Sequence, residues 1–259
     1  GCAYLVSFYN FPGVNFFKWT LILSFAVPPY IYAYSLTAFF ENYGTAFSIL
    51  KSVFGDGNYN SSIPKFDGML GAILSVSFSL FGYVYILTRA SFYHQSQNLI
   101  ELGKNLGFSK IKSMFSIVLP SARPAIIAGL ALVCMEVISD FGTVEFFTVE
   151  TLTLGIFNVW LGMNNLVAAA QISIIAFIFV IALLFIEFKS RANRRFNDNS
   201  QRQTIIKKVS LPPLKSTFSA LFCFFPIFMG FLLPVILLLL PEHPQHQRKS
   251  RWPYFQQTF

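Results

Sequence analysis

Two acidic residues inside an apolar segment are the first candidates for chemistry in this chain. Glu136 and Asp140 are spaced i, i+4, so on a helix they lie on one face. Carboxylates inside a membrane-spanning helix are rare and usually face the bundle interior or a wet cavity. Because hard cations prefer oxygen ligands, one interpretation is that the pair contacts a cation along an ion pathway. The other interpretation is structural: the two carboxylates cap helices or bond backbone groups where a helix is broken.

The other residue types that support chemistry are scattered. Cys2, Cys134 and Cys223 show no CxxC spacing, so neither a zinc site nor a disulfide framework is predicted. His243 and His246 are spaced i, i+3, but the prolines around them argue against a helix there. A GxxxxGK[ST] phosphate loop is absent from the sequence. We therefore expect no catalytic residue, no cofactor bound by this chain and no firm metal site, and the chain is not expected to be an enzyme.

The composition indicates that these residues are positioned by helices in a membrane. The sequence is 54% hydrophobic and only 12% charged, whereas soluble domains carry about 25% charged residues. So much apolar material exceeds what one soluble core of this length can bury. The net charge of +8 does not indicate nucleic-acid binding, because the basic residues lie in short loops between apolar runs. The predicted fold class is all-α, a polytopic transmembrane helical bundle in contact with membrane lipid.

Five segments are long and apolar enough to span a bilayer, which needs about 20 apolar residues. They are residues 17–40, 68–88, 119–141, 166–188 and 218–240. The first contains Pro28 and Pro29, and the last contains Pro226 and Pro234. Proline is tolerated in spanning helices because neighbouring groups bond the freed carbonyls, so these residues predict kinks.

The distribution of Lys and Arg predicts the orientation of the spans. Loops 89–118 and 189–216 are rich in Lys and Arg, so they are predicted to be cytoplasmic. Loop 142–165 has no Lys or Arg and is predicted to be external. Loop 41–67 is then external as well, although it holds two lysines. The chain is thus expected to be a multi-pass protein of the cell membrane.

The cytoplasmic loop between the second and third spans carries a spaced motif. Leu99, Leu102 and Leu106 recur at helical spacing and form an apolar stripe. Gly107 is predicted to end this helix in a left-handed cap. A second helical stretch follows, with an apolar side made of Ile111, Met114, Phe115 and Val118.

The fixed points of this loop are Glu101, Gly107, Ile117 and Pro120, in the pattern E-x5-G-x9-I-x-L-P. Pro120 fits the first turn of the third spanning helix, where a missing N–H costs little. An amphipathic connector on the membrane surface is the alternative, but it would need no such spacing. A short helix with an apolar ridge and a glycine suits insertion into a groove on another protein.

The motif resembles the EAA loop of ATP-binding cassette (ABC) importer permeases at every fixed position except two alanines, which are Leu102 and Gly103 here. The loop then covers about residues 91–120. Five further segments look like ferric-iron importer permeases, and the similarity covers roughly residues 4–240. These segments are 9–13, 119–126, 135–143, 151–156 and 159–163.

The resemblance implies a MetI-like permease, a subunit of a binding-protein-dependent importer of the inner membrane. It implies four partners: a cytoplasmic ABC ATPase dimer that hydrolyses ATP with Mg²⁺, a periplasmic or lipoprotein substrate-binding protein, a second permease half, and membrane lipid. Ferric iron is the expected cargo. Thiamine or a polyamine remains an alternative cargo, and a secondary transporter or a non-functional inserted fragment remains an alternative class.

The resemblance also implies a domain division. Residues 1–216 are expected to form most of a first permease half whose N-terminus is missing, and residues 217–240 the first span of a second half. The composition changes abruptly at Pro241, so residues 241–259 are expected to be an atypical tail that is not native sequence.

Overall fold

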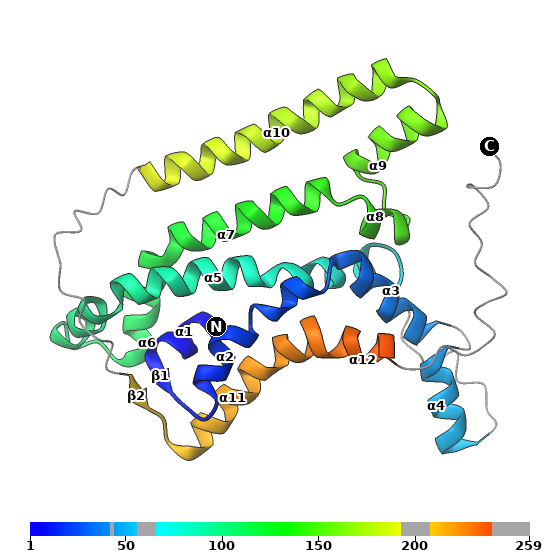
Figure 1. The fold of residues 1–259 in the computed structure, drawn as a ribbon. Helices are drawn as coiled ribbons and strands as arrows, with labels where there is room; N and C mark the ends of the chain where they lie inside the picture. Colours follow the sequence, from blue (N-terminus) through cyan, green and yellow to red (C-terminus); the bar gives the residue numbers. More distant parts are fainter. Residues whose placement is uncertain (42–43, 56–65, 193–207, 240–259) are drawn as a thin grey trace.

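The computed structural model describes residues 1–41, 44–55, 66–192 and 208–239, and it confirms the all-α fold class. Long helices lie side by side along one common direction (Figure 1). The first half of the chain forms α1 (Cys2–Phe8), β1 (Tyr9–Asn10), α2 (Val14–Thr20), a 3₁₀ turn (Leu23–Ala26), α3 (Pro29–Phe40), α4 (Thr45–Phe54) and α5 (Gly68–Asn105). The second half forms α6 (Lys110–Ser113), α7 (Leu119–Ser139), α8 (Gly142–Phe146), α9 (Leu152–Phe157), α10 (Leu166–Ala192), β2 (Val209–Ser210), α11 (Pro213–Ile227) and α12 (Leu233–Leu239).

Four helical segments in the described residues are long and apolar enough to cross a membrane. They are Gly68–Tyr93, Ile111–Ser139, Leu166–Phe185 and Pro213–Leu239. These segments confirm the last four predicted spans and shift some of their ends. Three π-helical turns join the helices: Met114–Val118 before α7, Asn158–Gly162 after α9 and Phe228–Leu232 between α11 and α12.

The predicted first span, residues 17–40, is sharply bent at its prolines. Residues Val14–Ala26 and Pro29–Phe54 form two helical parts that meet at an angle of 84°. Pro28 has φ −57° and ψ 147°, because a residue that precedes a proline avoids the helical region. Pro29 then begins α3, where its missing N–H needs no partner. The predicted kink is therefore confirmed, and it is sharp enough to break the span.

The last span bends at its prolines without breaking. Pro226 lies inside α11 and Pro234 in the first turn of α12, with the π-helical turn Phe228–Leu232 between them. A proline removes one helical hydrogen bond and crowds the preceding turn, and a wider π-helical turn accommodates both effects. The segment therefore passes as one candidate span over Pro213–Leu239.

Helices α5 and α7 form the antiparallel centre of the bundle (Figure 1). Gly129 of α7 allows this close approach, because a Cβ atom there would lie 2.7 Å from the Cα atom of Val84 in α5. Small residues at helix contacts are typical of membrane bundles, where close backbone packing replaces the hydrophobic drive of water.

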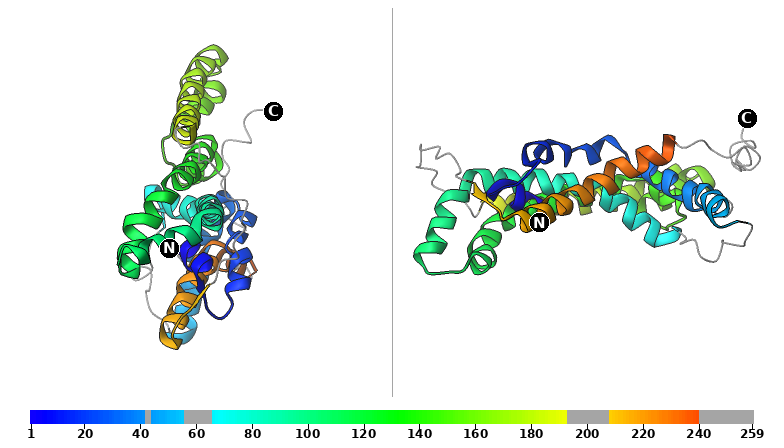
Figure 2. Two further views of the ribbon diagram at one scale, coloured as in Figure 1. Left: turned by 90° about the vertical axis from the view of Figure 1, so that its left-hand side faces the viewer. Right: turned by 90° about the horizontal axis from the view of Figure 1, so that it is seen from below.

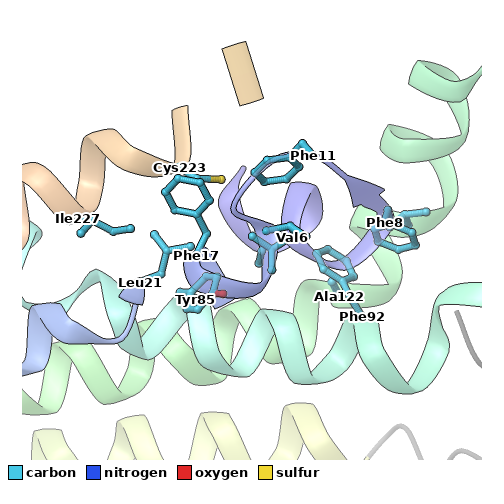
Figure 3. Close-up of a cluster of buried hydrophobic side chains, with 13 residues drawn as sticks. Val6, Phe8, Phe11, Phe17, Leu21, Tyr85, Phe92, Ala122, Cys223 and Ile227 are labelled. Atoms are coloured by element: carbon cyan, nitrogen blue, oxygen red, sulfur yellow. The ribbon is translucent and has the colours of Figure 1, made fainter. Parts of the chain in front are cut away.

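The main buried cluster lies where α1, α2, α5, α7 and α11 meet (Figure 3). Val6, Leu21 and Cys223 are fully buried there, and Phe8 contacts Phe92 with ring centroids 5.4 Å apart. This cluster fixes the N-terminal segment against the end of α5 from which the loop 91–120 projects.

A two-residue parallel ladder adds a second link at the same end of the bundle. Tyr9 pairs with Val209, and Asn10 pairs with Ser210. The Lys208 ammonium also donates a hydrogen bond to the Val6 carbonyl at 2.7 Å. The segment that precedes α11 is therefore bound to the N-terminal segment, although some 200 residues separate them in the sequence.

Helix α10 is the outermost helix and packs on α7 and α9 (Figures 1 and 2). Only 6% of its most apolar 18-residue window is buried, so its apolar side chains suit contact with lipid or another subunit. Loop 89–118 and the described part of loop 189–216 lie at one end of the bundle, and α8 and α9 lie at the other (Figure 1). The predicted alternation of these loops is confirmed, whereas the side that faces the cytoplasm stays a prediction.

The domain division at residue 216 also stays a prediction. The last span begins at Pro213, three residues before that division. Residues 241–259 lie outside the described part of the chain.

Candidate functional site

The loop between α5 and α7 is a hairpin of two helical extensions. Helix α5 continues 12 residues past Tyr93 to Asn105, and α6 with its π-helical turn leads directly into α7. The prediction of two separate connector helices is therefore corrected. No proline interrupts residues 68–105, so the spanning helix continues beyond the apolar segment by about 18 Å at 1.5 Å per residue.

Gly107 ends α5 in the predicted left-handed cap. Its φ is +68°, and the Phe108 N–H donates to the Gly103 carbonyl at 2.9 Å. This six-to-one bond is the signature of the Schellman motif, which satisfies a carbonyl left free at a helix end. A Cβ atom at Gly107 would meet nothing within 4 Å, so the backbone angle alone requires glycine here.

The close contact in the hairpin is at Gly103, a residue that the sequence comparison treated only as a replacement for alanine. A Cβ atom at Gly103 would lie 2.2 Å from Ser113 Oγ and 2.9 Å from Ser113 Cβ. Ile117 packs beside it, with its Cδ1 3.6 Å from the same point. Gly103 and Ser113 therefore join the two arms of the hairpin. The glycine in place of alanine marks this position in the sequence but does not identify Ser113 as its partner.

The second arm starts with a serine cap. The Lys112 N–H donates to Ser109 Oγ at 3.3 Å, and the Ser113 N–H donates to the Ser109 carbonyl at 2.8 Å. The Lys112 ammonium lies 4.5 Å from the centre of the Phe108 ring, a cation–π contact across the turn. These contacts stabilise the turn at the tip of the hairpin.

The predicted apolar side of the second arm is partly buried and partly exposed. Val118 is buried in the main cluster and Met114 is half-buried, whereas Ile111 and Phe115 are 73% and 59% exposed. Phe115 and Val118 both belong to the π-helical turn Met114–Val118, and Ile111 precedes that turn.

Two predicted fixed points lie on this second arm. Ile117 is half-buried beside Gly103. Pro120 lies in the first turn of α7 as predicted. However, the π-helical turn runs into α7 without a break, so Pro120 follows helical residues and does not start a new helix.

The first arm is only partly described. Leu106 is 55% exposed near the tip. The backbone of Leu99, Glu101 and Leu102 belongs to α5, but their side chains lie outside the described part of the chain. The predicted stripe of leucines and the position of the Glu101 carboxylate therefore stay predictions.

An apolar groove of about 650 Å³ lies beside the base of the hairpin. It is open, and its walls come from α1, the second arm and α11. Tyr4, Met114 and Phe218 contribute to its lining. Its apolar walls suit neither an ion nor a nucleotide.

The carboxylates Glu136 and Asp140 lie at the other end of α7. The helix ends at Ser139, and Asp140 has an extended ψ of 116°. Asp140 Oδ1 accepts a hydrogen bond from the Thr143 N–H at 3.1 Å, in the first turn of α8. Glu136 is exposed on α7. Asp140 is the C-cap of α7, and its φ of −72° is still helical, so the shared helix face of the two carboxylates stays a prediction.

The structural interpretation is supported for Asp140, which caps α8. The other carboxylate oxygen of Asp140 and the hydroxyl of Thr143 are buried without a hydrogen-bond partner among the described residues. The ion-pathway interpretation stays a hypothesis for Glu136. Within the described residues, no group of three or more His, Cys, Asp and Glu side chains is arranged to hold a metal ion.

Comparison with known proteins gives a family for this arrangement. The family model described as "Binding-protein-dependent transport system inner membrane component" matches residues 2–195. The Fe(3+)-transport system permease protein FbpB 2 of Haemophilus influenzae is 23% identical over 241 residues, which cover 92% of this chain and 43% of that protein. The sulfate transport system permease protein CysT of Salmonella typhimurium is 27% identical over 149 residues, which cover 56% of this chain and 49% of that protein. CysT of Escherichia coli matches to the same extent.

The chain spans about half the length of the curated relatives that it matches. The match to the family model includes the hairpin and four of the predicted spans. The all-helical bundle with four or five candidate spans agrees with a multi-pass protein of the inner membrane. The chain belongs to the binding-protein-dependent transport system inner membrane components, the permease family of ABC importers.

Proposed function

We propose that the hairpin at residues 91–120 docks this permease onto a cytoplasmic ABC ATPase. The observation that carries the proposal is the exposed apolar group Leu106, Ile111 and Phe115 on a hairpin whose arms meet at Gly103 and Ser113. Gly129 of α7 packs closely against Val84 of α5, and Gly103 of the first arm packs closely against Ser113 of the second. In both contacts the later residue of one segment pairs with the earlier residue of the other segment, so the two arms run antiparallel. Both arms therefore extend past the level of Tyr93, where the apolar segment of α5 ends.

Exposed apolar side chains on a rigid projection suit a hydrophobic groove on another protein. The Schellman cap at Gly107 and the Gly103–Ser113 contact reduce the conformational entropy that docking would otherwise cost. A rigid hairpin that continues two spanning helices also transmits movement: a displacement at its tip moves α5 and α7 together.

The remaining partners follow from the same proposal. ATP hydrolysis with Mg²⁺ takes place on the ATPase dimer. A periplasmic or lipoprotein binding protein delivers the cargo at the opposite end of the bundle, near α8 and α9. A second permease half completes the translocation unit. This chain holds no catalytic residue and no cofactor in the proposal.

Ferric iron is the proposed cargo. The ferric-iron permease of Haemophilus influenzae is similar along 92% of this chain, whereas the sulfate permeases match 56% of it. The exposed carboxylate of Glu136 adds a physical argument, because negative charge along a pathway favours a hard cation and repels a divalent anion. Sulfate is the second candidate, since two of the relatives are named sulfate permeases.

Uptake of radioactive ferric iron and of sulfate separates the two cargoes. The chain is expressed with its ATPase, its binding protein and the second permease half. Ferric iron uptake above the level without the ATPase supports the proposal, and Glu136→Gln is expected to lower it. Sulfate uptake without iron uptake contradicts the proposed cargo.

Co-purification tests the docking separately from the cargo. Leu106→Glu or Phe115→Glu places a charge in the docking surface and is expected to release the ATPase from the solubilised permease. Leu161→Glu is the matched control, because Leu161 is exposed at the opposite end of the bundle. Retention of the ATPase by both hairpin variants contradicts the docking surface. A transporter that works without any ATPase would instead be a secondary transporter.

A further inference from the structure

Three cationic side chains from distant parts of the sequence converge beside the main buried cluster. Lys18 belongs to α2, Arg89 to α5, and Lys208 immediately precedes β2. The carbonyl of Val6, which Lys208 contacts, and the carbonyl of Lys18, which Arg89 contacts, belong to α1 and α2, which pack together beside this cluster. All three residues are partly buried.

Hydrogen bonds to the backbone hold these side chains in place. The Arg89 Nη1 group donates to the Lys18 carbonyl at 2.8 Å, and the Tyr85 hydroxyl donates to the same carbonyl at 3.1 Å. Lys208 donates to the Val6 carbonyl at 2.7 Å, and Lys18 Nζ donates to Asn15 Oδ1 at 2.7 Å. The partners are neutral groups, so these bonds orient the cations without cancelling their charge.

The cluster lacks a counter-charge in the described part of the chain. No carboxylate of the described residues forms a salt bridge with Lys18, Arg89 or Lys208, and their hydrogen-bond acceptors there are neutral oxygens. Burial first, and then the positive charges of Lys18 and Arg89, lower the pKa of Lys208 to about 8. Cations that repel one another in a partly buried site are stabilised when an anion binds between them.

The cluster lies where lipid headgroups are expected. Arg89 is four residues from the end of the candidate span Gly68–Tyr93, and Lys208 is five residues before the candidate span Pro213–Leu239. Trp19, which is 69% exposed, lies under the Arg89 guanidinium at 5.5 Å from its ring centre. Tryptophan and arginine together at the end of a span are typical of the membrane–water interface.

We propose that Lys18, Arg89 and Lys208 form a binding site for a phosphate group. Arginine and lysine supply the charge-assisted hydrogen bonds that phosphate oxygens accept. The headgroup of an anionic phospholipid is one source of that phosphate, and free inorganic phosphate is the other. The site links α2, α5 and the segment before α11, so an occupied site holds the N-terminal segment and the last span together. The site is independent of the cargo and of ATPase docking.

Lipid binding by the full chain in nanodiscs tests the site. Nanodiscs are made with phosphatidylglycerol or with phosphatidylcholine alone, and the retained lipid is measured by native mass spectrometry. A parallel arm measures the thermal unfolding of the chain in phosphatidylcholine nanodiscs with and without inorganic phosphate. Wild type is expected to retain phosphatidylglycerol preferentially. Lys208→Gln and Lys18→Gln are each expected to lower that preference about fivefold, the effect of one basic residue near an anionic membrane surface.

Two controls separate a specific site from general attraction. Lys208→Arg keeps the charge and is expected to keep the preference, and the thermal unfolding of Lys208→Gln shows whether that variant folds. Lys215→Gln removes an exposed lysine near the same end of the last span and is expected to change nothing. If inorganic phosphate raises the unfolding temperature of wild type but not of Lys208→Gln, the site is supported and its ligand is a soluble anion. Equal losses in Lys208→Gln and Lys215→Gln, or no response to either source of phosphate, overturn the proposal.

Discussion

Replacing Gly103 by alanine restores the residue that the EAA loop usually carries, yet the structure predicts that the change weakens the hairpin. The added Cβ would lie 2.2 Å from Ser113 Oγ and 2.9 Å from Ser113 Cβ. Rotation of the Ser113 side chain relieves the first contact. The second contact is relieved only when the two arms of the hairpin move apart.

Two effects of opposite sign set the magnitude. Overpacking of a close contact costs about 1–3 kcal/mol, and alanine in place of glycine inside a helix gains about 1 kcal/mol. The expected net loss for Gly103→Ala is therefore about 0–2 kcal/mol. Ser113→Gly removes both atoms that clash. A double-mutant cycle with Gly103→Ala and Ser113→Gly thus isolates the steric term, and a coupling energy of about 1–3 kcal/mol is expected.

The assay is thermal unfolding of the purified chain in detergent, combined with retention of the ATPase. A loss of 1 kcal/mol corresponds to a Tm change of about 2–4 °C in a chain of this size. Gly155→Ala is the matched control, since a Cβ atom at this helical glycine would meet nothing within 4 Å. If Gly103→Ala raises the Tm as much as Gly155→Ala does, and Ser113→Gly shows no coupling, the close contact does not exist.

Three further predictions use other parts of the molecule. Gly107→Ala places a Cβ on a residue with φ +68° and is expected to cost about 1–2 kcal/mol, with Gly107→Asn less costly; equal stability of the alanine variant would contradict the left-handed cap. Asp140→Ala removes the acceptor for the Thr143 N–H and is expected to cost about 1 kcal/mol of stability. Asp140→Asn keeps an acceptor and is expected to keep most of the stability. If Asp140→Asn abolishes iron uptake without loss of stability, Asp140 has a pathway role instead. The pKa of Lys208 is lowered to about 8 in the fold, so above that pH the unfolded chain binds more protons than the folded chain. The contribution of Lys208 to stability is therefore expected to rise from pH 8 toward pH 10.5. The rise is measured as the Tm difference between wild type and Lys208→Gln, and a difference that falls over this window would contradict the buried cation.

The spans and the hairpin cap were predictable because they depend on local signals. Apolar runs of sufficient length predicted four spans, and glycine predicted the left-handed residue at Gly107. The prolines Pro28 and Pro29 predicted a kink but not its size. An angle of 84° depends on how α3 packs against the rest of the bundle, which hydropathy does not report.

The features that the sequence did not predict depend on contacts between distant segments. Nothing in the spacing of residues indicates that Ser113 faces Gly103, or that Met114–Val118 form a π-helical turn. The i, i+4 spacing did not indicate that Asp140 lies at the end of α7 and accepts a hydrogen bond from the Thr143 N–H. The convergence of Lys208 with Lys18 and Arg89 follows from the short parallel ladder between β1 and β2, which is too short to give a strand pattern.

Site-specific photo-crosslinking to the ATPase tests the central claim most directly. A photoreactive amino acid at Leu106 or Phe115 is expected to crosslink the ATPase in the assembled complex, because both side chains are exposed on the hairpin. The same probe at Leu161 or Met163, which are exposed at the opposite end, is expected to give no ATPase adduct. Adducts from the opposite end, or none from the hairpin in a complex that contains the ATPase, would contradict the account.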